Sequence, residues 1–537
     1  MLDDEQEGFR PQRNTLRYLY KLVATLDECK KRKLTTFLLC VDFSKAFDSI
    51  WVKGLAVKLE KYLIQGKILR VIHNFLHARK VQLKINSHLG YARLCGQFGL
   101  PQGSILSPLL FILYVSDMLS RDQLPSECHS NSNLFKYADD GSVAVSHINP
   151  IYAHLIMQKM CQYLYVWCSK WKLIPNCDIN KTECIIIAPN TSIGNFGHTF
   201  VPLKIGRKQI NYASQSTVLG LTIDSELTFK NHANFKLRQC WFAWHKITCN
   251  SNRYRGLNAS SLRMLFKTIV LTKLLYAAPI WLKENLGVYK DFYARVILKI
   301  SGATHHPPQK ITSVALGIPP LELAYKMVTV KFIIKALTSD ALMQGLILQL
   351  EDSRTHRFYH HIDMTRHFLS WKATSNKISR NRINLLTCIG DGVVNYSKEE
   401  MTGFLEHCWG LHNYFDGTIS EEAFEFNKIS CISKLLLPRH SHRITDTKVI
   451  SLLHGHDNCF KAFESRVTGN GDPFCSSCST PDNRHHRTFE CPLYNCAYRD
   501  ALQHHSNSSQ PMWSMIAEGN VKVLSAFRCL AQLAMTE

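Results

Sequence analysis

The sequence YADD at residues 137–140 constrains the fold and the chemistry of this chain more than any other stretch. Apolar residues dominate just before it (134–138) and just after it (142–146), which is typical of two short β-strands. The Asp140-Gly141 pair between them is one of the strongest short-range signals for a hairpin turn. An isolated Asp-Gly pair would more often be a turn and nothing else. Here we predict a hairpin with two adjacent carboxylates at its tip, where they repel each other unless a cation neutralises them.

A second apolar run, from Phe37 to Val41, ends on another acidic residue, Asp42. Two strands would then bring three carboxylates together, those of Asp42, Asp139 and Asp140. Hard divalent cations such as Mg²⁺ prefer oxygen ligands and keep open positions for water and substrate phosphates. The pattern therefore predicts a site for a pair of Mg²⁺ (or Mn²⁺) ions.

The charge balance indicates a polyanionic partner. Lys and Arg total 64 residues against 42 Asp and Glu, which gives a formal net charge of +22. Charge alone leaves two partners open, nucleic acid first and an anionic membrane surface second. No stretch approaches the roughly 18 to 20 apolar residues that span a bilayer. We expect no membrane association.

The N-terminus and the cysteines indicate the compartment. The first residues are acidic and polar, so they form neither a signal peptide nor a transit peptide. The 19 cysteines are scattered along the chain, which argues for a reducing compartment and against a disulfide framework. We expect an intracellular protein of the nucleus and cytoplasm.

These motifs resemble a reverse transcriptase encoded by a non-LTR retrotransposon, a LINE-like element of the jockey or I type. The resemblance rests on YADD, on CVDFSKAFDSIW around Asp42 and on GLPQGSILSP at residues 99–108. It implies an α+β fold arranged as a right-hand polymerase, with an antiparallel-sheet palm, partial fingers, a helical thumb and a small zinc-binding C-terminal tail. It also implies an RNA-directed DNA polymerase, a nucleotidyltransferase, whose partners are an RNA template and a DNA primer. The oligomeric state stays open.

The same resemblance implies roles for individual acidic residues. Asp42 and Asp139 would bridge the two metal ions, with Asp140 adjacent and less essential. The backbone carbonyl of Phe43 would be an additional ligand near the bound nucleotide.

Three further residues would contact the nucleotide by resemblance. Phe47 lies where the family places an aromatic ring against the sugar 2′ position, although an isolated Phe47 would more often belong to the core. Gln102 would contact the nascent base pair and template from its Gly-Pro loop. Lys181, just before an apolar run, would act near the departing pyrophosphate as a general acid or charge stabiliser.

Several local patterns predict secondary structure around these motifs. Asn14 or Thr15 is expected to cap the first helix, and Ser107 followed by Pro108 to begin another. The alternating residues 80–86 predict a strand. Residues 216–232 resemble the hairpin that holds the primer end in the family.

Residues 231–300 are strongly basic. They contain twelve Lys and Arg residues but only two acidic ones, Glu284 and Asp291. Because their apolar spacing is helical and aromatic residues are interleaved, we predict a helical thumb that lies on a duplex backbone. A merely solvated helix face is the alternative. The near-match to an RNase H motif at Asp391-Gly392 lacks a flanking strand and partner acids, so we do not predict that activity.

One group near the C-terminus has the spacing of metal ligands: Cys475-x₂-Cys478-x₇-His486-x₄-Cys491. Thiolates and an imidazole on tight turns suit a closed tetrahedral site for a structural Zn²⁺ ion. His485 competes with His486 for this role, and Cys496 is an unassigned extra. Chance grouping among so many cysteines is the alternative interpretation.

The family carries a further stretch of fingers ahead of the segment that opens this chain, so we expect the chain to be N-terminally truncated, and no endonuclease motif is visible. The competing hypothesis is a catalytically inactive remnant that acts at most as a nucleic-acid-binding protein. The expected organisation is a fingers remnant at 1–35, the palm at 36–232, the thumb at 233–320, a connecting region at 321–445, the zinc-knuckle-like region at 446–510 and a tail at 511–537.

Overall fold

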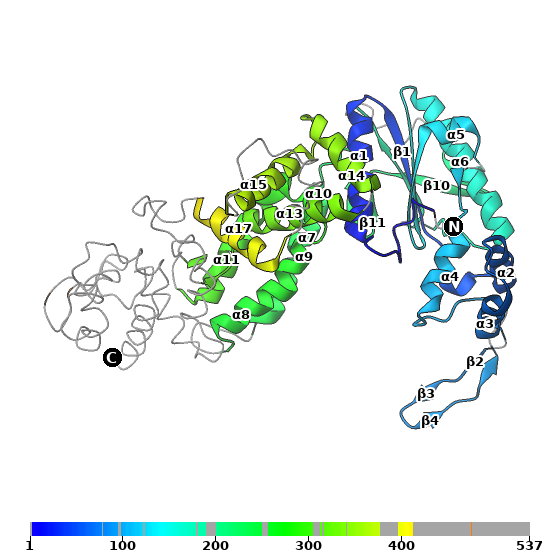
Figure 1. Cartoon of the computed structure of the whole chain (residues 1–537), viewed down its shortest axis with the longest axis horizontal. Helices are drawn as coiled ribbons and strands as arrows, with labels where there is room; N and C mark the ends of the chain where they lie inside the picture. The colour runs from blue at the N-terminus through cyan, green and yellow to red at the C-terminus, as the bar shows by residue number, and fades with distance from the viewer. Residues whose placement is uncertain are drawn as a thin grey trace. The chain divides into compact units, whose positions relative to one another are not determined.

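The computed structural model describes residues 3–77, 79–94, 98–121, 124–178, 181–189, 200–249, 256–303, 312–313, 316–339, 341–375, 396–411, 474 and 479. The chain divides into two compact units (Figure 1). Unit 1 contains Met1–His232 together with Asp352–Tyr359, and unit 2 contains Ala233–Glu351 together with His360–Glu537.

Unit 1 is built on a six-stranded sheet with the strand order β6-β7-β1-β8-β10-β9. All neighbouring strands pair in antiparallel fashion except β8 and β10, which are parallel. Every residue of β1 is buried, which is why its sequence is almost continuously apolar. The strands are β1 (Thr35–Val41), β6 (Ser132–Tyr137), β7 (Asp140–His147), β8 (Glu183–Ile187), β9 (Leu203–Ile205) and β10 (Lys208–Ala213).

Two long helices cover the two faces of this sheet, α1 (Thr15–Lys31) and α6 (Pro150–Trp171) (Figure 1). The Asn14 side chain caps α1 by accepting a hydrogen bond from the Arg17 backbone N–H, which selects one of the two predicted caps. The core on the α6 side includes Phe37, Leu39 and Val41, the alternate residues of β1. The sheet is thus a buried middle layer, and its strand ends are fixed from both sides.

Between β1 and α6 the chain also forms the 3₁₀ helix η1 (Phe47–Ser49) and helices α2 (Val52–Lys61), α3 (Gly66–Leu76), α4 (Leu106–Val115) and α5 (Ser126–Asn131). Helix α4 begins earlier than predicted: Ser107 is already helical, and its hydroxyl donates to the Pro101 carbonyl instead of capping. The cap was misplaced because this hydroxyl is used to fix the preceding loop.

The predicted strand at 80–86 is broken into two short strands of an exposed arm, which we define as residues 79–94. Its two-residue strands pair as β2 with β5 and as β3 with β4. All eight strand residues are exposed, and the arm extends away from the sheet (Figure 1). The strands are β2 (Lys80–Val81), β3 (Lys84–Ile85), β4 (His88–Leu89) and β5 (Arg93–Leu94).

The hairpin predicted from residues 216–232 is confirmed as β11 (Gln215–Val218) and β12 (Leu221–Asp224). Leu219 and Gly220 join the strands, both with positive φ (45° and 77°). Two successive positive φ angles are the geometry of a type I′ turn, which suits the twist of paired strands.

A short segment from far along the chain completes unit 1. Phe358 stacks on Tyr20 of α1, with ring centroids 4.3 Å apart. His356 Nε2 lies 3.4 Å from Asp27 Oδ2, and the Arg357 guanidinium donates to the Leu227 carbonyl at 3.0 Å. Residues 352–359 therefore form a strap over α1, held by a ring stack and polar contacts.

The described part of unit 2 is helical. Buried Phe266, Trp281, Val296 and Ile300 contribute to its core. Its elements are the C-terminal part of α7 (Lys230–Thr248), α8 (Ala259–Leu265), the π-helical η5 (Phe266–Leu271), α9 (Thr272–Leu274), α10 (Ala278–Trp281), the 3₁₀ helix η6 (Lys283–Tyr289), α11 (Lys290–Ser301), α13 (Leu321–Ser339), α14 (Ala341–Asp352), α15 (Tyr359–Ser375) and α17 (Lys398–Leu411).

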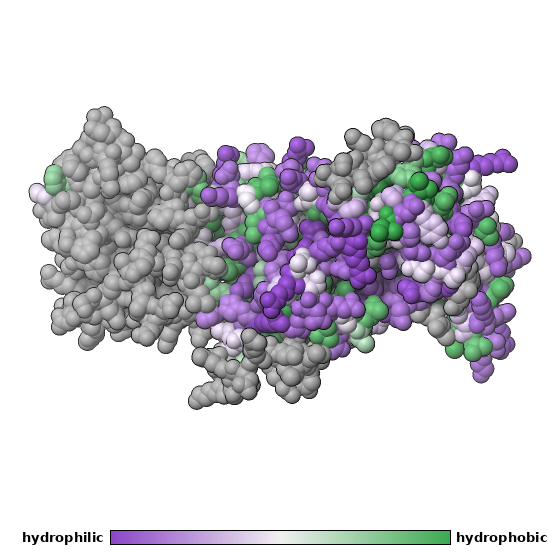
Figure 2. Space-filling view, turned by 90° about the horizontal axis from the view of Figure 1, so that it is seen from above, coloured by the Kyte–Doolittle hydropathy of each residue, from purple (hydrophilic) through white to green (hydrophobic). Residues whose placement is uncertain are grey.

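Within the described ranges, no helix combines the length and the apolar character needed to cross a bilayer. The face drawn in Figure 2 is mostly hydrophilic where residues are described, with apolar residues scattered among the polar ones.

Candidate active site

The register of the sheet brings the predicted acidic strand ends together. Val41, the last residue of β1, pairs with Gly141 of β7. Asp42 follows directly, so it lies beside Asp140 at the same end of the two strands. We call the place where Asp42, Asp139 and Asp140 lie the acidic edge. Asp139 precedes Asp140 in the turn that joins β6 to β7.

The turn itself differs from the prediction. Tyr137 pairs with Asp140, so the two connecting residues are Ala138 and Asp139, not Asp140 and Gly141. Ala138 has a φ of 54°, in the left-handed region that residues with a Cβ atom seldom adopt. Gly141 instead belongs to the ladder, because it pairs with Val41 on one side and with Lys136 on the other.

The carboxylates are electrostatically unfavourable to one another. Burial raises the pKa of Asp140 to about 6, with Asp139 and Asp42 adding to the shift. Burial and the charge of Asp42 also raise the pKa of Asp139. Carboxylates that resist ionisation in this way form an oxygen-rich site that a divalent cation would stabilise.

Asp42 has neighbours that partly balance its charge. Lys181 Nζ lies 3.6 Å from Asp42 Oδ2, and Asn176 Nδ2 donates to the same oxygen at 3.4 Å. The Asn176 backbone N–H also donates to the Asp42 carbonyl at 2.8 Å, and the Asp42 N–H donates to the Thr182 hydroxyl at 3.2 Å. The structure thus places Lys181 beside Asp42, and its role at the departing pyrophosphate stays a prediction.

Asn176 was missed by the sequence argument. The signal available was its position in the same loop as Lys181, directly after the Pro175 residue that forms a bridge with Phe43. Its side-chain amide holds one carboxylate oxygen of Asp42, while its backbone N–H holds the Asp42 carbonyl.

The donor chemistry fits hard divalent cations, although the described side chains are not gathered around one point. Among the described residues, no group of three or more His, Cys, Asp and Glu is close enough to hold a metal ion. Asp42, Asp139 and Asp140 interact through their charges while lying at the ends of adjacent strands. The predicted Zn²⁺ ligands Cys475, Cys478, His486 and Cys491 lie outside the described residues.

Both phenylalanines of the predicted nucleotide site are packed against neighbours. Phe43 is buried next to Pro175. Phe47 is partly buried and stacks on Phe111 of α4 at 4.4 Å, with Phe9 edge-on at 6.3 Å. Phe47 therefore has the core contacts expected of an isolated phenylalanine, while one part of it stays accessible.

Gln102 lies in a loop that approaches the backbone of residue 48. Its Nε2 atom donates to Asp48 Oδ1 at 3.3 Å. Gly99 has a φ of 92°, and a Cβ atom there would lie 3.1 Å from the Asp48 carbonyl oxygen. Among the contacts described, Gln102 meets Asp48 and none of the three aspartates of the acidic edge.

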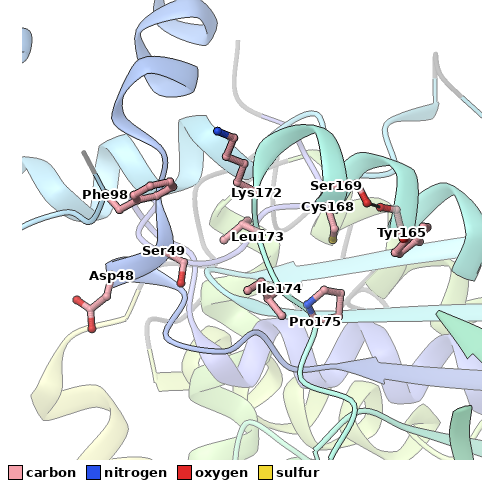
Figure 3. A pocket seen from close by; sticks show the side chains of 10 residues that line it. All are labelled: Asp48, Ser49, Phe98, Tyr165, Cys168, Ser169, Lys172, Leu173, Ile174 and Pro175. Atoms are coloured by element: carbon pink, nitrogen blue, oxygen red, sulfur yellow. Dashed lines mark hydrogen bonds between the residues drawn. The ribbon is translucent and has the colours of Figure 1, made fainter. Parts of the chain in front are cut away.

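A pocket of about 550 Å³ lies near this loop and was not predicted (Figure 3). Asp48, Phe98, Tyr165 and Lys172 are among its lining residues, whereas none of the three aspartates of the acidic edge lines it. The Lys172 ammonium lies 4.2 Å from the centre of the Trp51 ring, a cation–π contact.

Several cations of the basic helical region have structural partners. Lys267 donates to the Gly317 carbonyl at 2.5 Å, and burial lowers its pKa to about 8. Arg263 donates to the Leu316 carbonyl at 3.2 Å. Arg238, Lys246 and Lys273 are exposed. Among the described residues of 231–300, some of the predicted basic side chains are thus used in contacts within the fold, and others are exposed.

Residues 1–223 match the profile of the reverse transcriptase (RNA-dependent DNA polymerase) family. The chain is 26% identical over 281 residues to the probable RNA-directed DNA polymerase from transposon BS of Drosophila melanogaster, covering 52% of this chain and 30% of that protein. It is 24% identical over 324 residues to the RNA-directed DNA polymerase from mobile element jockey of Drosophila funebris, covering 59% and 34%. The chain thus matches about a third of the length of these relatives.

Among solved structures, an apo telomerase from Candida Tropicalis superposes with a TM-score of 0.32 and 13% identity, over 64% of this chain and 57% of that one. A TM-score this low carries no argument about the fold or the function of this chain.

Proposed function

Because residues 1–223 are a reverse transcriptase domain related to those of non-LTR mobile elements, we propose that this chain extends a DNA primer along an RNA template. The observation that carries this proposal is the convergence of Asp42, Asp139 and Asp140 at one edge of the sheet. Two strands and one turn supply carboxylates whose mutual repulsion is relieved when cations bind.

In this proposal Asp42 and Asp139 would hold two Mg²⁺ (or Mn²⁺) ions, with Asp140 as an adjacent, less essential ligand. When bound, such ions lower the pKa of the primer 3′-hydroxyl and neutralise the triphosphate and the leaving pyrophosphate. Asn176 keeps the Asp42 carboxylate in one orientation through its bond to Oδ2. Lys181, now paired with Asp42, would turn to the pyrophosphate and supply charge or a proton as it leaves.

The neighbouring residues would select the nucleotide. The Phe47 ring is held by its stack on Phe111, so a ribose 2′-hydroxyl would meet a surface that cannot easily move. The carbonyl of Phe43 would contact the bound nucleotide and its ion. Gln102 would exchange its contact with Asp48 for the nascent base pair.

We assign residues 36–232 to the palm and 233–320 to the thumb, with a fingers remnant at 1–35. The exposed cations of the helical thumb would contact the phosphates of the primer–template duplex. Cys475, Cys478, His486 and Cys491 would hold a structural Zn²⁺ ion in the C-terminal region.

Incorporation of deoxynucleotides on an RNA template with a DNA primer tests this proposal. We expect extension that requires Mg²⁺ or Mn²⁺, stops with EDTA and disappears when the template is omitted. The competing function, nucleic-acid binding without chemistry, predicts retention of the primer–template on the protein with no extension under any metal condition. The strongly positive chain would still bind in that case, so extension is the measurement that separates the two.

A further inference from the structure

The N-terminal segment adds a short ladder to the outer edge of the acidic hairpin. The Glu7 N–H donates to the Lys136 carbonyl at 2.8 Å, and the Lys136 N–H donates to the Glu5 carbonyl at 3.3 Å. Gln6 and Lys136 thereby form a parallel bridge. Strand β6 is the edge of the six-stranded sheet, and residues 5–7 cover that edge locally.

The side chain of Gln6 reaches the turn that carries Asp139. Gln6 is fully buried, at 0% exposure. Its Oε1 atom accepts one hydrogen bond from the Ala138 backbone N–H and one from the Gly8 backbone N–H, each at 2.9 Å. Ala138 immediately precedes Asp139, so this oxygen fixes the backbone one residue before the carboxylate.

Ala138 needs such support because of its conformation. The left-handed region is disfavoured for a residue with a Cβ atom, and such a residue persists only where its surroundings hold it. A buried backbone N–H without an acceptor would add a further cost. The Oε1 atom of Gln6 supplies that acceptor at Ala138, where the backbone conformation of the hairpin is unfavourable.

Two neighbouring residues fix Gln6 in turn. A Cβ atom on Gly8 would lie 2.4 Å from the Ala138 nitrogen, so only glycine lets the segment pass this close to the turn. The Glu7 carboxylate, almost fully buried, pairs with Arg17 Nε at 2.8 Å and Lys21 Nζ at 2.9 Å on α1. The segment is thus anchored to a helix that itself packs on the sheet.

We propose that Gln6 is a positioning residue that fixes Asp139 by holding the Ala138 N–H in the left-handed turn. The catalytic consequence rests on the proposed function, whereas the hydrogen bond and its effect on the turn do not. Residues that orient a metal ligand without touching the metal typically change activity by about 10- to 100-fold when they are replaced.

The first measurement is hydrogen–deuterium exchange of the whole protein, read on the peptide that covers residues 134–141. Gln6→Met removes the acceptor and keeps the side-chain length, and exchange in this peptide should accelerate roughly fivefold or more. Gln65→Met, at an exposed glutamine whose side chain caps nothing, should leave it unchanged. The β11–β12 turn is an internal reference, because general unfolding would accelerate its exchange as well.

The second measurement is steady-state extension of a primer on an RNA template. Gln6→Met should lower kcat by about 10-fold or more while the KM for the nucleotide changes little. Gln6→Glu keeps an acceptor oxygen at the same distance from the backbone. Exchange at residues 134–141 should therefore stay as slow as in the wild type. Gly8→Ala should resemble Gln6→Met, because it displaces the same segment.

The outcomes separate the two proposals. Unchanged exchange at 134–141 in Gln6→Met overturns the inference, whatever the enzyme assay gives. Faster exchange with an undiminished kcat overturns the role in positioning Asp139. A wild-type protein that does not extend primers contradicts the proposed function. Faster exchange in Gln6→Met would still show, in that case, that Gln6 stabilises the turn.

Discussion

Two of the hairpin-like structures in unit 1, the acidic hairpin β6–β7 and the arm at residues 79–94, have opposite surroundings. The acidic hairpin β6–β7 pairs over six positions, and β7 then pairs with the fully buried β1. The arm at residues 79–94 pairs over two positions in each of its two short ladders, and all of its strand residues are exposed. Only the first has a third strand beside it.

This difference shows which surroundings allow a hairpin to carry a group of acidic side chains. An isolated two-stranded hairpin is marginally stable in water, because neither face is buried. The acidic hairpin gains a neighbouring strand, a covering helix and the segment around Gln6. It can therefore hold carboxylates that repel each other, whereas the arm has no comparable means of holding an unfavourable group.

The largest effect should come from the turn of the acidic hairpin. Asp139→Asn removes the charge that would hold a cation, and we expect primer extension to fall by roughly a thousandfold or more, since such charge stabilisation is worth several kcal/mol. Extension kinetics with Mg²⁺ and with Mn²⁺ measure this. Asp178→Asn, an exposed aspartate in the loop of Lys181, is the matched control and should retain activity. Activity that survives Asp139→Asn would remove the turn from the proposed site.

The next effect concerns packing. Phe135 of β6 is buried and contacts Tyr18 of α1 edge-on. Phe135→Ala should destabilise unit 1 by about 3 kcal/mol, because the transfer free energy is lost and a cavity remains. Urea denaturation measures the change, and Phe135→Leu, which keeps most of the apolar volume, should cost clearly less. A loss well below this value for Phe135→Ala would mean that the packing around Phe135 is loose.

The charge of Asp140 should oppose folding above its raised pKa. The folded carboxyl has a pKa of about 6 against an ordinary 3.8, so it binds its proton more tightly in the folded state. Stability is then lost as the pH rises between these values. Asp140→Asn should stabilise the protein by about 1 to 2 kcal/mol at pH 7.5 in EDTA, a figure reduced for partial solvent exposure. The gain should vanish near pH 3.5.

Urea denaturation at both pH values tests this prediction, with Asp178→Asn again as the control. Addition of Mg²⁺ should narrow the difference between wild type and Asp140→Asn at pH 7.5, since the cation relieves the same repulsion. A variant that is less stable than the wild type in EDTA at pH 7.5 would mean that hydrogen bonds of the ionised carboxylate outweigh its repulsion.

The smallest effect should come from the arm. Tyr91 is 97% exposed, so Tyr91→Ala should change the free energy of unfolding by no more than about 0.5 kcal/mol. The measurement is the same denaturation series, which makes Tyr91→Ala directly comparable with Phe135→Ala. A loss above about 1 kcal/mol would indicate that the arm is covered in solution, and the comparison between the two hairpins would then fail.

The sequence predicted the features that depend on neighbouring residues of the chain. It did not predict contacts between residues that are far apart in sequence. The strands that end on Asp42 and at YADD could be found because apolar runs and acidic ends are adjacent in the chain. The turn was misplaced because the acceptor for the Ala138 N–H belongs to Gln6, far away in sequence. The prediction of a single strand at 80–86 was wrong, because no neighbouring strand pairs along its full length.

The same distinction applies to side chains. Lys181 was predicted by resemblance to act near the departing pyrophosphate, whereas Asn176 belongs to no motif that would identify it. The excess of positive charge at 231–300 predicted helices that carry cations. It could not indicate that Lys267 and Arg263 donate to backbone carbonyls instead. The Zn²⁺ ligands stay predictions, because they lie outside the described residues.

The strap at residues 352–359 has a consequence for dividing the protein into pieces. A gene fragment that stops after His232 would encode the whole sheet but not Phe358, and the ring of Tyr20 would lose its stacking partner. Such a fragment should be less soluble than its sheet suggests, because an aromatic side chain that is buried in the full chain would then meet water. A synthetic peptide of residues 350–361 should rescue it by binding in trans. Unit 1 would in this respect behave as a split protein, whose two pieces associate without a covalent link.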